Sequence, residues 1–267
     1  MMKTSNDYKE INKKLWNEKV ASHLSSDFYD MESFLAGNSS LNPVELDLLG
    51  HVEGKKILHL QCHFGQDTLS LARLGAEVTG LDLSDQAILA AEELAKKLNL
   101  DAKFICADVY NTPESLNAQF DMVFTSYGTI GWLPDLNAWA AVIKRVLKPG
   151  GQFVFVEFHP VVWMFDYNFE KVGYNYFNDG PVEEMTEGTY ADREAEISNN
   201  SVSWNHSLGE VFTALLNEGF HINSFQEYDY SPYNCFLNTE EYEPKKFRIK
   251  HLGNNIPMLY ALSATKA

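Results

Sequence analysis

The sequence predicts a doubly wound α/β fold built on a mostly parallel sheet, and three observations carry this prediction. Short apolar segments alternate with helix-like segments between residues 56 and 158. The apolar segments are continuous rather than alternating, which is typical of parallel strands buried on both faces. Helix caps and glycines stand where the helix-like segments begin and end. We therefore expect strand and helix to follow one another through this stretch.

The individual elements follow from these signals. Ser84 and Asp135 each precede an amphipathic segment, so they are expected to accept hydrogen bonds from the free amides at a helix start. Gly75 and the turn Pro149–Gly151 are expected to end helices. Strands are expected at residues 57–60, 78–81, 104–107, 120–125 and 153–158, and the first helix of this stretch at 66–74.

The segments on either side have a different character. Residues from about 6 to 51 are helical in pattern, whereas residues 160–205 are rich in Tyr, Phe, Asn, Gly and Glu and break the alternation. Ser207 and Glu210 have the spacing of a capping box, which predicts one further helix. Strand-like pieces stand at 188–190, 202–204, 220–228 and 258–264.

Charge and composition exclude several classes of function. The 267 residues include 37 Asp and Glu against 21 Lys and Arg, a formal net charge of −16. Such a surface repels phosphate backbones, so no nucleic-acid partner is expected. No apolar run approaches the ~20 residues that span a bilayer, and the N-terminus lacks a secretion signal, so neither a membrane partner nor export is expected. Three widely spaced cysteines fit a cytoplasmic protein without disulfides or a metal site.

Loops after the predicted strands carry the candidate binding residues. In an open parallel sheet, ligands bind outside the carboxyl ends of the strands, near the point where strand order reverses. The first such loop leads into a helix N-terminus, whose free amides favour a carboxylate. Asp82 ends the second strand 21 residues after Gln61, where a carboxylate can accept hydrogen bonds from ribose hydroxyls, and Asp108 follows the third, where it can accept from an adenine amino group. The candidates are Gln61, Cys62, His63, Gly65, Thr68, Asp82, Leu83, Ala107, Asp108, Val109, Thr125 and Ser126.

These residues stand in a pattern that resembles class I S-adenosylmethionine-dependent methyltransferases. Asp82, the segments 106–108 and 120–123 and the turn Leu147–Gly151 have the order and spacing of that family's motifs. The resemblance covers residues 50–160 well and the C-terminal strands loosely. It implies a Rossmann-like sheet of seven strands, the last one antiparallel. It also implies S-adenosylmethionine as the methyl donor and S-adenosylhomocysteine as the product.

The first loop departs from the family pattern. The family has an acidic residue followed by alternating glycines, whereas this chain has His59, Gln61, His63 and Gly65 at those positions. Glycine permits positive φ and a close approach of backbone to ligand. Either Gln61 and His63 contact the cofactor through their side chains, or the loop no longer binds it. The run QCHFGQDT resembles a bacterial subgroup of the family, which favours the first interpretation.

The candidates for catalysis and substrate binding lie beyond these motifs. His159 follows the fifth strand and has the pKa of a general base, although a cap or surface role fits equally well. Tyr127 is the second catalytic candidate, while Tyr8 and Trp16 form either a lid or ordinary helix packing. Aromatic residues of 160–205 predict a pocket for a small, partly apolar or cationic acceptor, or else a small core of their own. They are Trp163, Phe165, Tyr167, Tyr174, Tyr176, Phe177 and Tyr190.

The whole sequence is therefore interpreted as a methyltransferase that acts on a small-molecule acceptor, as a monomer or homodimer. A catalytically inactive nucleotide-binding module on the same fold is one alternative. An NAD(P)-dependent oxidoreductase is another, but it should show a G-x-G-x-x-G turn that residues 61–65 do not supply. Four parts are predicted: an N-terminal helical lid (1–52), a cofactor-binding core (53–159), an inserted substrate-covering segment (160–205) and a C-terminal helix and strands completing the sheet (206–267).

Overall fold

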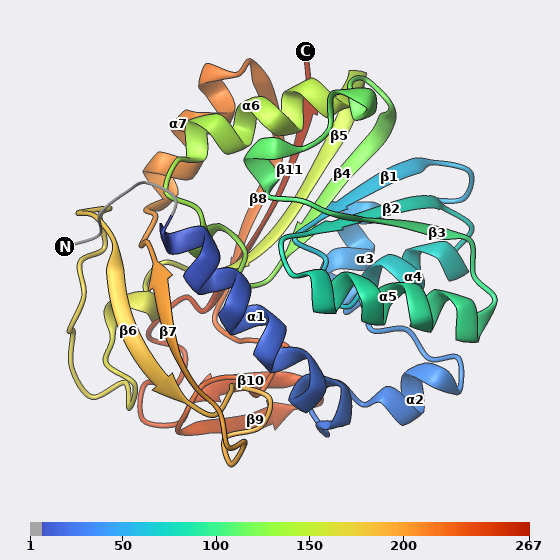
Figure 1. Cartoon of the computed structure of the whole chain (residues 1–267). Helices are drawn as coiled ribbons and strands as arrows, with labels where there is room; N and C mark the ends of the chain where they lie inside the picture. The colour runs from blue at the N-terminus through green and yellow to red at the C-terminus, as the bar shows by residue number, and fades with distance from the viewer. Residues whose placement is uncertain (1–6) are drawn as a thin grey trace.

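A computed structural model describes residues 7–267, and one seven-stranded sheet forms its centre (Figure 1). Residues 1–6, which the predicted N-terminal lid includes, lie outside the described residues. The strands run in the order β3-β2-β1-β4-β5-β11-β8. Their bounds are β1 (Lys56–Leu60), β2 (Glu77–Asp82), β3 (Ala102–Cys106), β4 (Phe120–Ser126), β5 (Leu147–Phe158), β8 (Phe220–Tyr228) and β11 (Leu259–Lys266).

The sheet confirms the predicted fold class. Strands β1 to β5 pair in parallel, and the last strand, β11, is antiparallel to both of its neighbours, β5 and β8. Strand order reverses between β1 and β4, because the chain passes outward through β2 and β3 before it returns. This reversal places the carboxyl ends of β1, β2 and β4 around one crevice.

Helices cover both faces of the sheet, as the continuous apolar strands require. Helices α6 and α7 pack on one face, while α3 and α4 cover the other and α5 lies against β3. The Ser84 hydroxyl accepts from the Ala87 amide at 3.0 Å, and Asp135 caps α6, so both predicted caps are confirmed. These helices are α3 (Pro43–Leu49), α4 (Gln66–Arg73), α5 (Asp85–Leu98), α6 (Leu136–Val146) and α7 (Leu208–Asn217).

One predicted cap is only half correct. The Ser207 hydroxyl accepts from the Glu210 amide at 3.2 Å, as a capping box requires. The Glu210 carboxylate does not return the bond to the Ser207 amide, because it lies 3.0 Å from the ring of His206 instead.

Asp121, at the start of β4, accepts from the Lys56 amide and pairs with Lys148. Its role is therefore structural.

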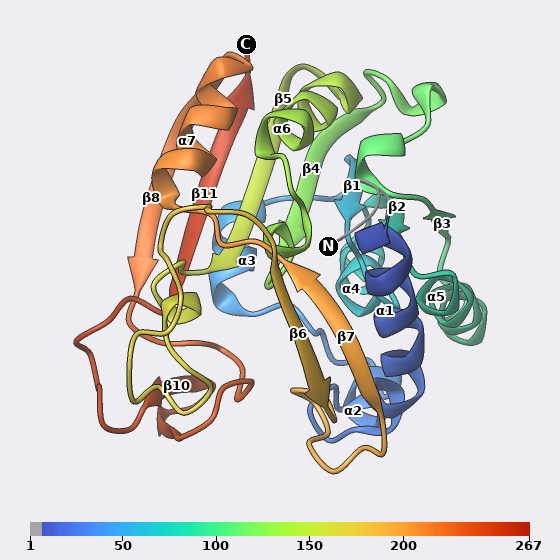
Figure 2. The ribbon, with the colours of Figure 1, turned by 60° about the vertical axis from the view of Figure 1, so that its left-hand side comes forward.

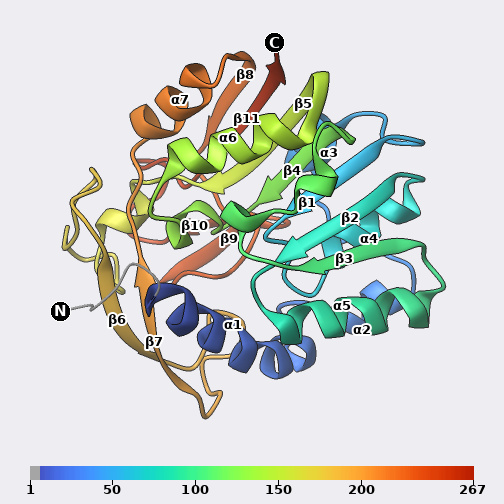
Figure 3. The same ribbon diagram turned by 45° about the horizontal axis from the view of Figure 1, so that its top comes forward.

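Further segments gather beyond the carboxyl ends of the parallel strands (Figures 1 and 2). Helix α1 runs between β7 and α5, as Figure 3 shows. The strand-like piece predicted at 188–190 is wrong, because these residues turn between β6 and β7, and the hairpin of β9 and β10 is not predicted at all. The segments are α1 (Asp7–Ser25), α2 (Met31–Leu35), β6 (Val182–Glu187), β7 (Ser198–Ser203), β9 (Thr239–Glu243) and β10 (Lys246–Ile249), and short 3-10 turns are η1 (Val109–Asn111), η2 (Glu114–Leu116), η3 (Ile130–Trp132) and η4 (Val162–Met164).

Neither a membrane-spanning helix nor a metal-binding cluster is found among residues 7–267. None of the helices there is long and apolar enough to cross a bilayer. In the same part of the chain, no group of three or more His, Cys, Asp or Glu side chains is arranged to hold a metal ion.

Candidate active site

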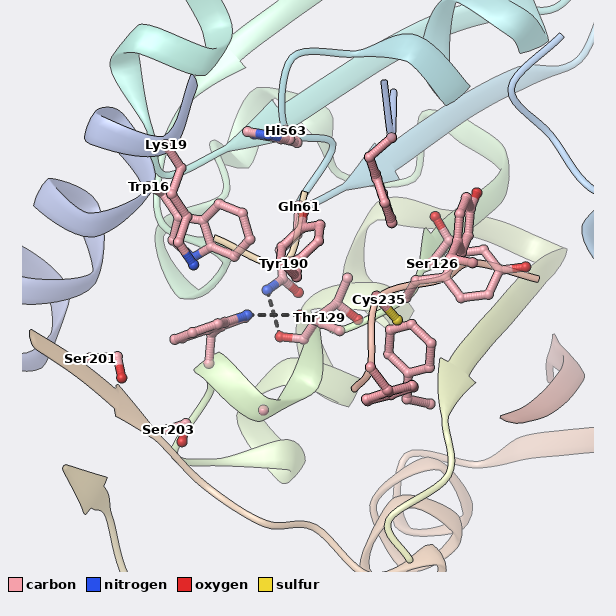
Figure 4. A pocket seen from close by; sticks show the side chains of 18 of the residues that line it. Trp16, Lys19, Gln61, His63, Ser126, Thr129, Tyr190, Ser201, Ser203 and Cys235 are labelled. Carbon is pink, nitrogen blue, oxygen red and sulfur yellow. Dashed lines mark hydrogen bonds between the residues drawn. The ribbon is translucent and has the colours of Figure 1, made fainter. Parts of the chain in front are cut away.

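A cavity of about 860 Å³ lies between the strand ends and the segments beyond them (Figure 4). Its volume falls within the range of small-molecule sites. We call the wall borne by the sheet the floor, and the opposite wall the roof. The floor consists of residues 59–67, 82–83, 108–109 and 126–133, and the roof of α1, α2, residues 160–205 and residues 229–258.

The glycine-poor loop of the floor keeps the backbone conformation that glycines would give. Gln61 has φ 56°, His63 has φ 51° and Gly65 has φ 80°, so all three alternate positions are left-handed. A Cβ at position 65 would lie 2.8 Å from the ring of Phe104, whereas Gln61 and His63 carry side chains that the structure accommodates. Space therefore demands glycine only at the third position, and the loop path itself survives.

Side chains at the two substituted positions anchor this loop to neighbouring segments. The Gln61 amide nitrogen donates to the Thr129 carbonyl at 2.8 Å, which ties β1 to the loop after β4. The His63 ring forms a 2.8 Å hydrogen bond with the ring of His23 on α1 and lies edge-on to Trp16, 5.3 Å between centroids. A left-handed backbone costs about 1–2 kcal/mol for a residue other than glycine. These contacts offset that cost.

Asp82 stands at the crevice with hydrogen-bonding capacity to spare. One carboxylate oxygen accepts from the His63 amide and the other from the Ser84 amide, each at 2.8 Å. Burial raises the pKa of Asp82, and these amides oppose the shift. Each oxygen keeps a free lone pair. Asp82 therefore fixes the glycine-poor loop and can still accept from a ligand hydroxyl.

Asp108 is brought to the same cavity, but it already has a partner. One oxygen accepts from the Tyr110 amide at 2.7 Å, and the other lies 2.5 Å from the Lys9 ammonium of α1. The roof thus reaches across the adenine-binding position that the sequence predicts. A ligand amino group there must share this carboxylate with Lys9.

Most of the predicted cofactor residues line the cavity, and four candidates do not. Thr68, Ala107 and Thr125 lie behind its wall: the Thr68 hydroxyl bonds the His59 ring, and the Thr125 hydroxyl donates to the Leu60 carbonyl. His159 is the fourth. Those that line the cavity are Gln61, Cys62, His63, Gly65, Asp82, Leu83, Asp108, Val109, Ser126 and Tyr127.

His159 is oriented away from the cavity by its hydrogen bonds. Its Nε2 lies 2.8 Å from the Glu227 carboxylate, and its Nδ1 accepts from the Val161 amide. Burial lowers the pKa of His159, and Glu227 opposes the shift. With both ring nitrogens engaged and no place in the cavity wall, the structure does not support His159 as a general base.

A buried carboxylate that the sequence analysis did not select organises the loop after β4. Glu157 accepts from the amides of Thr129 at 2.7 Å and Ile130 at 3.2 Å, and also from the Gly128 amide. Burial raises its pKa, and these amide donors lower it. Tyr127, in a left-handed conformation at φ 50°, is directed into the cavity by this loop. In the sequence, Glu157 is a single charged residue within an apolar strand, and no further pattern marks it as a site residue.

Lys19 of α1 is a buried cation without an anion. Only 8% of its surface is exposed, and its ammonium lies 4.8 Å from the ring centroid of Trp16, 5.7 Å from Tyr190 and 6.0 Å from Trp132. No carboxylate within residues 7–267 forms an ion pair with it. Burial lowers its pKa to about 8. Cation–π contacts contribute up to about 2 kcal/mol, while taking an ammonium out of water costs several kcal/mol.

The roof closes the other part of the cavity with aromatic rings. Trp163 lies edge-on to Phe158 and Phe236, with centroids 5.9 and 5.7 Å apart, and Tyr127 meets Tyr233 at 4.9 Å. Phe236 and Tyr233 belong to residues 229–258, which the sequence analysis did not assign to the pocket. Of the aromatic residues predicted there, Tyr176 and Phe177 lie outside the cavity, while Trp163, Phe165, Tyr167, Tyr174 and Tyr190 line it.

Comparison with known proteins matches the first strands and helices of the central sheet to a family model. Residues 57–151 match the family described as a methyltransferase domain. The chain is 34% identical over 134 residues to an uncharacterized methyltransferase of Synechocystis, covering 49% of this chain and 60% of that one. It is 33% identical over 119 residues to a ubiquinone biosynthesis O-methyltransferase of Alkalilimnicola ehrlichii, covering 43% and 48%. The chain thus spans less than two thirds of these curated relatives.

Solved structures share the fold across most of the chain. An S-adenosylmethionine-dependent methyltransferase from Mesorhizobium loti superposes with a TM-score of 0.58 at 23% identity, covering 86% of this chain and 99% of that one. Geranyl diphosphate C-methyltransferase from Streptomyces coelicolor, in complex with S-adenosyl-L-homocysteine, reaches 0.62 at 14% identity, covering 99% and 100%. Residues 57–151 thus match the methyltransferase-domain family, and most of the chain shares the fold of these solved structures.

Proposed function

We propose that this protein is an S-adenosylmethionine-dependent methyltransferase acting on a small-molecule acceptor. The observation that carries the proposal is the left-handed path of Gln61, His63 and Gly65 beside the Asp82 carboxylate. This path retains the shape of a glycine-rich cofactor loop although two glycines are absent. Residues held in such a conformation cluster at active sites and ligand clamps, which supports a binding role for this loop.

Unsatisfied polar groups of the floor fit the donor. The Gln61 carboxamide oxygen and His63 Nδ1 are buried without a partner among the described residues. Asp82 has free lone pairs for ribose hydroxyls, and Asp108 has an oxygen near the position expected for the adenine. These residues would hold the cofactor, with Leu83 and Val109 supplying apolar contacts beside it.

When bound, the cofactor supplies a methyl group on a positively charged sulfur, which a nucleophilic acceptor atom can take by in-line displacement. The chain's own part is alignment and exclusion of water. Helix α1 and residues 160–205 and 229–258 cover the strand ends, and Tyr127, Phe158 and Trp163 give the acceptor an apolar wall. This wall supports a small, partly apolar acceptor.

Where the acceptor must lose a proton, we propose Asp67 in place of His159 as the group that takes it. Asp67 lines the cavity beside the loop after β4, and its carboxylate accepts from the hydroxyls of Ser126 at 3.2 Å and Ser40 at 2.6 Å. Burial raises its pKa above the usual value of a carboxyl, and the two hydroxyls oppose the shift. A raised pKa makes a carboxylate a better proton acceptor.

The charge and the cysteines of the chain bear on its partners and location. A net charge of −16 supports the absence of a nucleic-acid partner, and the protein is proposed to act as a monomer or homodimer. The three cysteines Cys62, Cys106 and Cys235 are all unpaired, which supports a cytoplasmic location.

Calorimetry and turnover together test the proposed function. Micromolar binding of S-adenosylmethionine or S-adenosylhomocysteine, with none of NADH, is the expected result. Selective binding of NADH would instead support an oxidoreductase. Release of S-adenosylhomocysteine with at least one member of a panel of small aromatic and apolar acceptors is then expected. Binding without turnover across a broad panel would support an inactive module on the same fold.

A further inference from the structure

We propose that Lys19 is a carboxylate-binding residue of the cavity, whose ammonium takes the acid group of a bound ligand. The inference rests on the proposed function, because that function brings a carboxylate into this cavity at the methionyl end of the donor. An acid group on the acceptor is the other source of the same chemistry. The experiment below separates the two.

Lys19 is placed where a ligand of the glycine-poor loop would reach it. It lies on α1 in the roof, and its side chain reaches the same cavity as Gln61 and His63 (Figure 4). Trp16 is the link between the two walls, since its ring lies beneath the Lys19 ammonium and edge-on to His63. A ligand that follows the glycine-poor loop therefore ends beside this ammonium.

None of the side chains around the Lys19 ammonium balances its positive charge. The neighbouring side chains are the rings of Trp16, Trp132 and Tyr190 and the imidazoles of His23 and His63. Burial lowers the pKa of both imidazoles, that of His63 to about 3. Both imidazoles are therefore neutral at pH 7. Lysine is almost never this deeply buried unless it is paired. The arrangement is therefore suited to bind an anion.

The other candidate for binding a carboxylate is the N-terminus of α4, where free amides favour an anion. That helix start already carries Asp67 in its first turn, and the Gln66 side chain donates to the Tyr29 carbonyl there. A second carboxylate would be repelled at this end. Lys19 offers the opposite charge and is buried, whereas Lys9 is paired with Asp108 and Lys245 is exposed.

Lys19→Met is the direct test, with binding read by calorimetry. The apolar side chain of methionine suits the aromatic surroundings of position 19, so we expect the ligand-free variant to melt at or above the wild-type temperature. We expect S-adenosylhomocysteine to bind about 30-fold more weakly, as for loss of one hydrogen bond between charged groups. The affinity for 5′-methylthioadenosine, which lacks the amino-acid end, should stay within about twofold of wild type. Lys19→Arg should restore most of the loss.

Controls separate this inference from the function on which it rests. Lys14→Met removes the same charge from an exposed position on the same helix and should change neither affinity. If wild-type protein binds neither S-adenosylhomocysteine nor 5′-methylthioadenosine, the proposed function fails. If both bind and Lys19→Met weakens neither, the donor is excluded as the source of the carboxylate.

A second arm then tests the acceptor as the source. Benzoate and benzamide are titrated into protein saturated with S-adenosylhomocysteine, because they share one shape and differ in charge. Weaker binding of benzoate alone in Lys19→Met, and in Lys19→Gln should the first variant fold poorly, would assign the site to the acceptor. Unchanged binding of benzoate together with unchanged binding of S-adenosylhomocysteine would overturn the inference.

Discussion

The floor and the roof of the cavity hold their side chains in place by different means. Floor residues stand at the ends of strands whose register is fixed by backbone pairing, for example Leu60 opposite Leu81 and Asp82 opposite Cys106. Roof segments belong to no common sheet and are joined mainly by side chains. Asn12 of α1 bonds both the amide and the carbonyl of Val202 on β7, and the hydroxyls of Tyr29 and Tyr190 lie 2.5 Å apart.

The difference between floor and roof fits two separate tasks, the binding of the donor and the binding of the acceptor. The rigid floor, fixed by backbone pairing, suits the donor. The roof, formed by loops and short elements joined through side chains, suits the acceptor. The comparison therefore predicts that floor substitutions change donor affinity, whereas roof substitutions on its aromatic part change acceptor turnover.

The largest effect is expected at the floor, for Asp82→Ala. Loss of two hydrogen bonds to a charged acceptor should weaken S-adenosylhomocysteine binding about 100-fold, roughly 2.7 kcal/mol. Binding of 5′-methylthioadenosine should fall equally, because it carries the same ribose. Asp121→Ala is the matched control, since that carboxylate serves the opposite end of the sheet through Lys56 and Lys148. A loss of similar size in the control would contradict the role of Asp82.

A roof substitution should give the opposite pattern. Trp163→Ala opens the aromatic wall beside Phe158 and Phe236, so we expect the KM for an accepted substrate to rise about 10-fold with donor affinity within about twofold. Phe177→Ala, in the same segment but 71% exposed, should change neither value. Steady-state kinetics and calorimetry measure the two quantities. Equal loss of both in Trp163→Ala would argue against a separate acceptor pocket.

The glycine-poor loop offers a smaller test based on stability. His63→Gly and His63→Ala both remove the bond to His23, but only alanine keeps a side chain at φ 51°. We expect the glycine variant to be more stable by about 1 kcal/mol in urea unfolding, the reverse of the usual order for an exchange of alanine for glycine. Equal stabilities, or a more stable alanine variant, would show that the loop leaves the left-handed path in solution.

An effect of similar size is expected from a single contact within the roof. Tyr190→Phe removes one hydroxyl of the pair with Tyr29 and should cost about 1 kcal/mol of stability, with donor affinity within about twofold. Faster amide hydrogen exchange is expected in residues 188–197, which this contact helps to hold. Unchanged exchange there together with a large loss of donor binding would mean that the floor depends on the roof more than the structure indicates.

The two regions also differ in how far the sequence alone can predict them. Parallel strands such as β4 and β5 are apolar along their length, and caps such as Ser84 act through neighbouring residues, so local patterns report them. The roof contacts join residues far apart, as Asn12 with Val202, and no local pattern reports such a pair. Residues 229–258 lack regular periodicity, so the hairpin of β9 and β10 was missed.

Individual site residues also divide into those whose place the sequence could predict and those whose place it could not. Asp82 was placed at the crevice because the end of a strand and its spacing from Gln61 are sequence properties. His159 also follows a strand, but Glu227 and the Val161 amide engage its ring, and neither contact can be foreseen from the sequence. The left-handed conformation at positions 61 and 63 was equally hidden, because side chains there suggest an ordinary backbone.

A crystal structure of the complex with S-adenosylhomocysteine tests the central claim most directly. The ligand should lie in the cavity with both ribose hydroxyls within hydrogen-bonding distance of Asp82, while Gln61 and His63 keep positive φ. Ligand density elsewhere, or an Asp82 carboxylate that contacts only the amides of His63 and Ser84 while the crevice stays empty, would contradict it.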